Sequence, residues 1–177
     1  ELNLHGNQLE EIPVLSISTL ERLDLGWNKI RTINDGMFEA LVNLKELYLY
    51  SNQLEEIPVL SISTLERLNL GWNKIRTIND GTFEALVNLK GLYLHGNQWE
   101  EIPVLSISTL ERLYLAWNKI RTINDGTFEA LVNLKELNLH GNQLEEIPVT
   151  IHDGAFEALV NLKELYLYGN PFKCDCA

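Results

Sequence analysis

The sequence has few basic residues and no long apolar run. Only 14 residues are Lys or Arg against 25 Asp and Glu, which gives a formal net charge of -11. Binding to nucleic acid neutralises phosphates with clustered Lys and Arg, so this balance excludes a nucleic-acid partner. Polar residues interrupt every apolar stretch well before the roughly 20 residues that a membrane span requires. We therefore predict no nucleic-acid binding and no membrane insertion.

Groupings of residues that support catalysis or metal binding are also missing. The chain has four histidines, and no two of them have the spacing of metal ligands. No serine or cysteine is placed to act as a nucleophile beside them. We therefore predict a protein that is not an enzyme and that has no cofactor and no metal site.

What the sequence does contain is a repeat. The pattern Leu-x-x-Leu-x-Leu-x-x-Asn-x-(Leu/Ile) recurs along the chain, with the first copy cut short at Glu1. Its asparagines are Asn7, Asn28, Asn52, Asn73, Asn97, Asn118, Asn142 and Asn170. Their spacing alternates between 21 and 24 residues and ends with 28, where a short repeat runs into a tall one after Val149. Such registered copies indicate a solenoid.

Each repeat is expected to form one short strand. In the stretch "LERLDL", side chains alternate between two faces, so Leu23 and Leu25 should point inward and Asp24 outward. The amide of Asn28 is suited to bonding backbone groups in the following turn and to forming a ladder with its equivalents. A phenylalanine spine is expected opposite the strands, formed by Phe38, Phe83, Phe128 and Phe156. Stability should come from stacking of neighbouring repeats.

These motifs resemble an extracellular leucine-rich repeat protein, and the resemblance covers essentially the whole chain. Alternating short and tall repeats resemble the small leucine-rich proteoglycans, and "NPFKCDCA" at 170–177 resembles the opening of a cysteine-rich C-terminal cap. The resemblance implies an α/β repeat solenoid, a horseshoe with one curved parallel sheet on the concave face and loops or short helical turns on the convex face. It divides the chain into a repeat array at 1–168 and a truncated cap at 169–177, and it implies an extracellular location.

The ends of the array are expected to be unfinished. Cys174 and Cys176 lie too close in sequence to bridge each other comfortably. They are free thiols, partners in an intermolecular disulfide, or half of a truncated cap whose other cysteines are missing. An exposed strand edge at Leu2 to Leu4 could support end-to-end association.

Parallel stacking should bring equivalent residues into columns on the sheet. The column before the first leucine of each strand, Leu23 and its equivalents, alternates in charge over most of its length: Arg22, Glu46, Arg67, Gly91, Arg112, Glu136 and Glu164. The column before it alternates in the same way, as Glu21, Lys45, Glu66, Lys90, Glu111, Lys135 and Lys163. Exposed pairs contribute about 0 to 1 kcal/mol each, but misregistered stacking would place like charges together. We interpret both columns as fixing register, except at the last step, where like charges meet.

The next columns collect aromatic residues. All six tyrosines fall on this face, together with three histidines and three tryptophans. A solvated sheet gains nothing in folding from tyrosine and tryptophan, whereas interfaces favour them. The candidate binding residues are Asp24, Trp27, Tyr48, Tyr50, Asn69, Trp72, Tyr93, His95, Tyr114, Trp117, Asn138, His140, Tyr166 and Tyr168. For the tryptophans, a structural role in covering the asparagine ladder stays equally open.

We predict a protein-recognition module whose concave face binds a protein ligand. The alternatives are a structural or engineered repeat scaffold without a ligand, self-association as a homodimer or end to end, and glycan binding through the aromatic residues.

Overall fold

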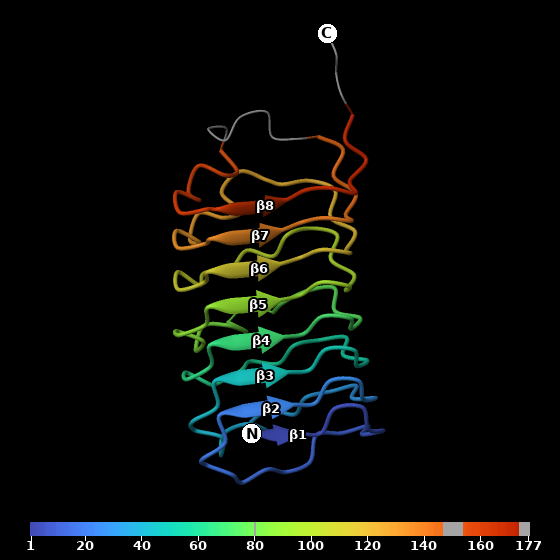
Figure 1. Cartoon of the computed structure of the whole chain (residues 1–177), viewed down its shortest axis with the longest axis vertical. Helices are drawn as coiled ribbons and strands as arrows, with labels where there is room; N and C mark the ends of the chain where they lie inside the picture. Colours follow the sequence, from blue (N-terminus) through green and yellow to red (C-terminus); the bar gives the residue numbers. More distant parts are fainter. Residues whose placement is uncertain (80, 147–153, 174–177) are drawn as a thin grey trace.

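The computed structural model describes residues 1–79, 81–146 and 154–173. Short strands stack in chain order into a single parallel sheet along the solenoid (Figure 1). The strands are β1 (Leu2–Asn3), β2 (Arg22–Asp24), β3 (Glu46–Tyr48), β4 (Arg67–Asn69), β5 (Gly91–Tyr93), β6 (Arg112–Tyr114), β7 (Glu136–Asn138) and β8 (Glu164–Tyr166). Each repeat contributes one strand, so every strand pairs only with its neighbours in sequence, as the repeat predicts.

The register of the sheet confirms the predicted columns. Between β2 and β3, Leu23 lies opposite Leu47 and Asp24 opposite Tyr48. The same register continues to β8, where Glu136 lies opposite Glu164 and places two like charges side by side, as expected. A shift of one residue would turn the leucines out of the core, so the period-two pattern fixes this alignment.

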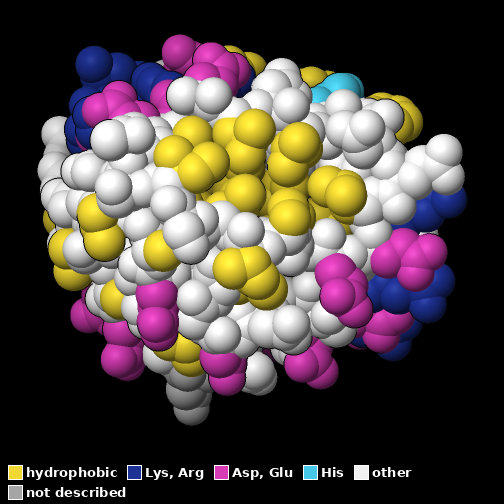
Figure 2. All heavy atoms as spheres, turned by 90° about the horizontal axis from the view of Figure 1, so that it is seen from below, with side chains coloured by type: hydrophobic (Ala, Val, Ile, Leu, Met, Phe, Trp, Pro, Cys, Tyr) yellow, Lys and Arg dark blue, Asp and Glu magenta, His cyan; other side chains and the backbone are white. Residues whose placement is uncertain are grey.

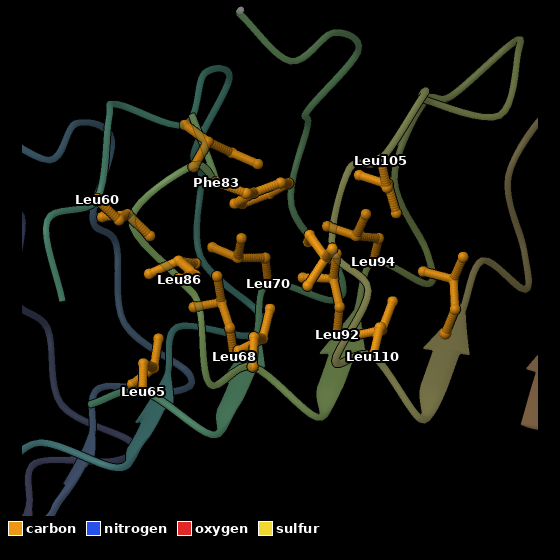
Figure 3. Close-up of a cluster of buried hydrophobic side chains, with 14 of the residues drawn as sticks. Leu60, Leu65, Leu68, Leu70, Phe83, Leu86, Leu92, Leu94, Leu105 and Leu110 are labelled. Carbon is orange, nitrogen blue, oxygen red and sulfur yellow. The ribbon is translucent and has the colours of Figure 1, made fainter. Parts of the chain in front are cut away.

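The core is built from the inward leucines of every repeat. Figure 3 shows Leu68, Leu70, Leu92 and Leu94 meeting in the interior, with Phe83 from a return segment on the far side. The predicted phenylalanine spine is buried at all of its positions: Phe38, Phe83, Phe128 and Phe156. Because the two faces of each repeat's core contact the repeats on either side, the fold is stabilised by stacking.

An asparagine ladder runs beside the sheet, as predicted. Asn97 is representative: its side-chain amide donates to the backbone oxygens of Leu70 and Leu94, at 3.0 and 3.1 Å. Its oxygen accepts from the backbone nitrogen of Ile75 at 3.0 Å. One side chain therefore bonds its own repeat and a neighbouring one. Because these backbone groups are buried, their bonds are needed to offset the loss of water.

The convex face is formed by turns and loops, one of the two forms predicted for it. The described residues contain no helix, so the α/β description and the short helical turns are not confirmed. The segment that begins at Asn34 instead forms successive tight turns, in which Met37 bonds back to Asn34 and Glu39 to Gly36. Gly36 has a φ of 74°, which a right-handed helix does not allow. The Asn-Asp-Gly sequence therefore forms turns here and not a helix.

The end of the solenoid next to β1 carries a patch of hydrophobic side chains (Figure 2). Leu2, Leu4, Leu9 and Leu15 are only partly buried, although their equivalents in the interior are covered. Within the described residues, β1 is the edge strand at this end of the sheet. Two other predictions lie outside the described residues: the junction after Val149 and the pairing of Cys174 and Cys176.

Candidate recognition surface

The inner column consists of the residues between the two strand leucines, and it contains two kinds of side chain. Tyrosines occupy Tyr48, Tyr93, Tyr114 and Tyr166, and Asn or Asp occupies the remaining positions, Asn3, Asp24, Asn69 and Asn138. Strand pairing brings these residues into one line, and all of them except Asn3 were predicted site residues. Their environments differ, however, and separate them into two functional groups.

The Asn and Asp members serve the backbone of their own turn. The Asn69 side-chain oxygen accepts from the backbone nitrogen of Gly71 at 3.0 Å. Asn138 does the same for the nitrogen of His140 at 3.1 Å, and Asp24 for that of Gly26 at 2.9 Å. This local side-chain to backbone bond is the one that Asn and Asp make in turns. At these positions the residue type is explained by the fold.

Asp24 is a correction to the predicted surface. It was expected to point to solvent, yet only 7% of it is exposed. The ring of Tyr50 covers this part of the sheet, because a Cβ placed on Gly26 would lie 2.6 Å from that ring. Asp24 therefore cannot present a free carboxylate to a ligand.

Three tyrosines of the inner column, Tyr48, Tyr114 and Tyr166, are oriented by glutamates instead. The hydroxyl of Tyr48 donates to Glu46 at 2.8 Å, and the Arg22 guanidinium lies 4.9 Å from the centre of its ring. Tyr114 donates to Glu136, and Tyr166 donates to Glu164. These bonds fix ring directions while leaving the rings partly exposed. Such preorganised aromatic groups lose little entropy when a partner binds.

Burial and the neighbouring carboxylates keep these hydroxyls protonated. Burial, followed by the hydrogen bond to Glu46, raises the pKa of Tyr48. The same two causes, with Glu136 as the acceptor, raise the pKa of Tyr114 further. Each hydroxyl is thus a neutral donor at physiological pH, already committed to a glutamate.

The centre of the surface lies at β5 and β6. The rings of Tyr93 and Tyr114 meet edge to face, with centres 4.8 Å apart. Tyr93 folds over Gly91, since a Cβ on that glycine would lie 3.0 Å from the ring. Gly91 replaces the glutamate found at Glu46 and Glu136, so the missing side chain makes room for this pair.

Beyond the second leucine, rings lie over small residues of the preceding repeat. His95 covers Gly71, where a Cβ would come within 2.5 Å of the imidazole. His140 stacks on Tyr168 with ring centres 4.5 Å apart. Burial, with a smaller effect of His140, lowers the pKa of His95, and burial also lowers that of His140. Tyr50, His95 and His140 therefore contribute to packing as well as to the surface.

The tryptophan row, defined as Trp27, Trp72 and Trp117, follows β2, β4 and β6. Each residue remains more than half exposed, at 62%, 52% and 55%. Each also has a positive φ, between 52° and 56°. The row forms a rim beside the inner column, at the ends of alternate strands.

These features agree with the match to known proteins. The leucine rich repeat family model matches residues 1–54, 59–98 and 108–172, most of the chain. The chain belongs to the leucine-rich repeat family. No curated protein matches the sequence closely enough to count as a relative. Leucine-rich repeat arrays are generally protein-interaction modules and typically not enzymes.

Two further kinds of feature, a metal site and a membrane-spanning helix, are both absent from the described part of this leucine-rich repeat array. Within residues 1–79, 81–146 and 154–173, no group of three His, Cys, Asp or Glu residues could hold a metal ion. In the same residues, no helix has the length and apolarity to cross a bilayer.

Sequence reasoning missed the glutamates and the glycine that organise the surface of the array. Glu46 and Glu136 were assigned only to register, yet they also hold Tyr48 and Tyr114. The signal was available in the pattern, because a glutamate stands two residues before Tyr48 and Tyr166. In a strand, residues two apart lie on the same face.

Trp99 is a buried exception among the tryptophans. It stands where other repeats carry leucine, and only 2% of it is exposed. Its indole nitrogen is buried without a hydrogen-bond partner in the structure. Trp99 therefore belongs to the core and not to the recognition surface.

Proposed function

We propose that this leucine-rich repeat array recognises a protein ligand through the tyrosines of its concave inner column. The observation that supports the proposal most is the edge-to-face pair of Tyr93 and Tyr114, partly exposed at the centre of the sheet. Tyrosine at the centre of a rigid surface is typical of residues that dominate binding energy. The Asn residues of the same column show that the fold does not require an aromatic ring there.

The charge of the chain supports a partner of basic character. The net charge of -11 raises association rates for positively charged proteins and opposes acidic ones. Around the inner column, Glu46 is neutralised by Arg22 and Arg67, and Glu136 by Arg112. The attraction is thus long-range, whereas local contacts would come from the tyrosines.

Site-specific photo-crosslinking tests the proposal. A photoreactive phenylalanine at position 93 should capture a defined protein from an extract of the producing organism, and excess unlabelled array should compete. The same group at Val87, an exposed residue outside the sheet, is the matched control. Capture from position 87 with none from position 93 would contradict the concave-face proposal.

A second candidate is self-association through the hydrophobic end next to β1 (Figure 2). Sedimentation velocity at several concentrations, with and without reductant, separates this case from a disulfide-linked dimer. A Leu2→Lys variant should remain monomeric at every concentration if that end carries the contact.

The expected extracellular location belongs to the same proposal. The resemblance of residues 170–177 to a cysteine-rich cap supports it. Secretion of the full-length protein from expressing cells, measured in the medium, tests this part separately.

A further inference from the structure

The tryptophan row occupies a backbone position that other repeats fill with glycine. Trp27, Trp72 and Trp117 have left-handed φ values, and the equivalent glycines of other repeats, such as Gly96, have φ values of 66° to 71°. A left-handed conformation is unfavourable for a residue with a side chain, because its Cβ crowds the backbone. Three repeats therefore carry a strained tryptophan where glycine would satisfy the chain. Strain of this kind gathers at functional sites.

The indoles are held in a defined orientation. The ring of Trp72 lies on Gly96 of the following repeat, where a Cβ would come within 2.5 Å of it. His95 meets the same ring edge to face, with centres 6.1 Å apart. Trp117 repeats this arrangement with Gly141 and His140, at 5.1 Å between ring centres. One side of each indole is thus supported, while more than half of the residue is exposed.

Trp27 has a different support. The following repeat carries Ser51 where the others carry glycine, and Trp27 is the most exposed of the row at 62%. We therefore expect Trp72 and Trp117 to be the better preorganised pair, with Trp27 as a weaker third position.

The spacing of the row selects among ligand conformations. Neighbouring parallel strands lie about 4.8 Å apart, so tryptophans on alternate strands repeat at about 9.6 Å. A polyproline II helix rises about 3.1 Å per residue with three residues per turn, which gives a repeat of about 9.3 Å. An extended strand presents one face about every 6.6 Å, and an α-helix has a pitch of about 5.4 Å. Only the polyproline repeat matches the row.

We propose that the tryptophan row binds a proline-rich segment of a partner protein in the polyproline II conformation. A proline at every third residue stacks its ring on one indole. Rows of aromatic side chains suit such segments because the polyproline helix is already ordered before binding. This inference rests on the proposed function for a protein ligand and specifies the chemistry of that ligand.

Charge complementarity adds basic residues between the prolines. The turn after the asparagine ladder carries exposed glutamate pairs, Glu10 and Glu11, Glu55 and Glu56, Glu100 and Glu101, and Glu145 and Glu146. They outnumber the Lys and Arg residues of the alternate repeats in this region, which are Lys29, Arg31, Lys74, Arg76, Lys119 and Arg121. With the net charge of -11, this favours a segment that carries Lys or Arg.

Titration with synthetic peptides tests the proposal. The probe is an Arg-containing peptide with proline at every third position, and the readout is tryptophan fluorescence with calorimetry as a second measurement. We expect saturable binding that is at least about thirtyfold weaker in a W72G/W117G variant, the loss typical of two aromatic anchors. The melting temperature should not fall by more than a few degrees, because glycine relieves the left-handed strain. Equal affinity in the variant would overturn the proposal.

A control peptide tests the spacing argument without any change to the protein. A peptide of the same composition with proline at every fourth position keeps charge and proline content but loses the repeat of about 9.3 Å. It should bind at least about tenfold more weakly. Equal binding of the two peptides would overturn the spacing argument, as would a saturable response to cello- or chito-oligosaccharides with none to the proline-rich peptide.

Two further variants separate this inference from the proposed function. Trp99→Leu removes a buried tryptophan and installs the leucine of the equivalent positions, so it should retain peptide binding. A Y93A/Y114A variant should lose the protein partner of the inner column yet bind the peptide. Peptide binding that is lost in Y93A/Y114A but kept in W72G/W117G would overturn the tryptophan row and leave the inner column supported.

Discussion

The asparagine ladder and the inner column lie side by side and use asparagine for different purposes. Each interior ladder asparagine bonds backbone groups of two repeats, as Asn97 does with Leu70, Leu94 and Ile75. An inner-column asparagine such as Asn69 bonds only the backbone of its own turn. The ladder position never varies among the interior repeats, whereas the inner column alternates between Asn, Asp and Tyr.

This difference explains why the residue type at the inner-column position varies among repeats. The inner column is not simply free of structural demands, because Asn69 and Asp24 each bond a backbone nitrogen two residues further on. Tyr48 and Tyr166 give up that bond and gain one to a glutamate two residues before them, Tyr114 gains one to Glu136 of the next strand, and Tyr93 packs over Gly91. A repeat therefore carries either a turn-stabilising residue or an oriented aromatic ring at this position.

The largest effect is expected at the ladder. Asn97→Ala removes four hydrogen bonds and leaves the buried backbone nitrogen of Ile75 without a partner, whereas the oxygens of Leu70 and Leu94 keep bonds from Asn73 and Asn118. An unsatisfied buried group costs about 1 to 3 kcal/mol and the other lost bonds add to that, so we expect the free energy of unfolding to fall by about 3 kcal/mol. Chemical denaturation measures this. A loss below about 1 kcal/mol would show that the ladder does not hold neighbouring repeats together.

A smaller effect is expected for the inner-column asparagine. Asn69→Ala removes one partly buried bond, to the nitrogen of Gly71. We expect a loss of about 1 kcal/mol, the net contribution of a single hydrogen bond. If Asn69→Ala and Asn97→Ala destabilised equally, the contrast between the two regions would be wrong.

The smallest effect is a change of stability with pH. Burial lowers the pKa of His95, so the folded protein resists a proton that the unfolded chain accepts near pH 6.5. Stability is therefore full above that pH and declines as the pH falls through it toward the lowered pKa of the folded state. The hydrogen bond from Lys90, followed by its charge, lowers the pKa of Glu66, and that contribution is lost only below about pH 4.5.

A variant at His95 isolates the part of the pH dependence that comes from this histidine. His95→Tyr installs the residue found at Tyr50, whose ring packs over Gly26 as His95 packs over Gly71. Between about pH 6.5 and 5, urea denaturation should show a smaller decline for this variant than for the original chain. An identical decline in both would assign the effect to other groups.

Most of the fold could be predicted from the sequence because the signals are periodic. Leucines two residues apart fixed the strand faces, and the asparagine at a constant offset fixed the ladder. The return segments were harder. The Asn-Asp-Gly turns compete with helix formation, and the described residues show turns where short helical turns were predicted.

The candidate site was predicted in position but not in detail. The columns follow from register alone, and the structure aligns them as expected. The ring of Tyr50 covers the sheet beside Asp24, at Gly26. Whether a ring covers such a position depends on the size of a side chain in the next repeat, and the alignment of columns alone does not reveal this. Strain at Trp72 is likewise invisible until the backbone is known, although glycine at the equivalent Gly96 was a usable signal.

The central claim is that the inner-column tyrosines carry recognition and the asparagines carry the fold. The most direct measurement is the affinity of a Y93N/Y114N variant for the crosslinked partner, together with its melting temperature. Asparagine already stands at equivalent positions, so we predict an affinity at least about thirtyfold lower and a melting temperature within a few degrees of the original. Unchanged affinity would contradict it, and so would a large loss of stability that accounts for the lost binding.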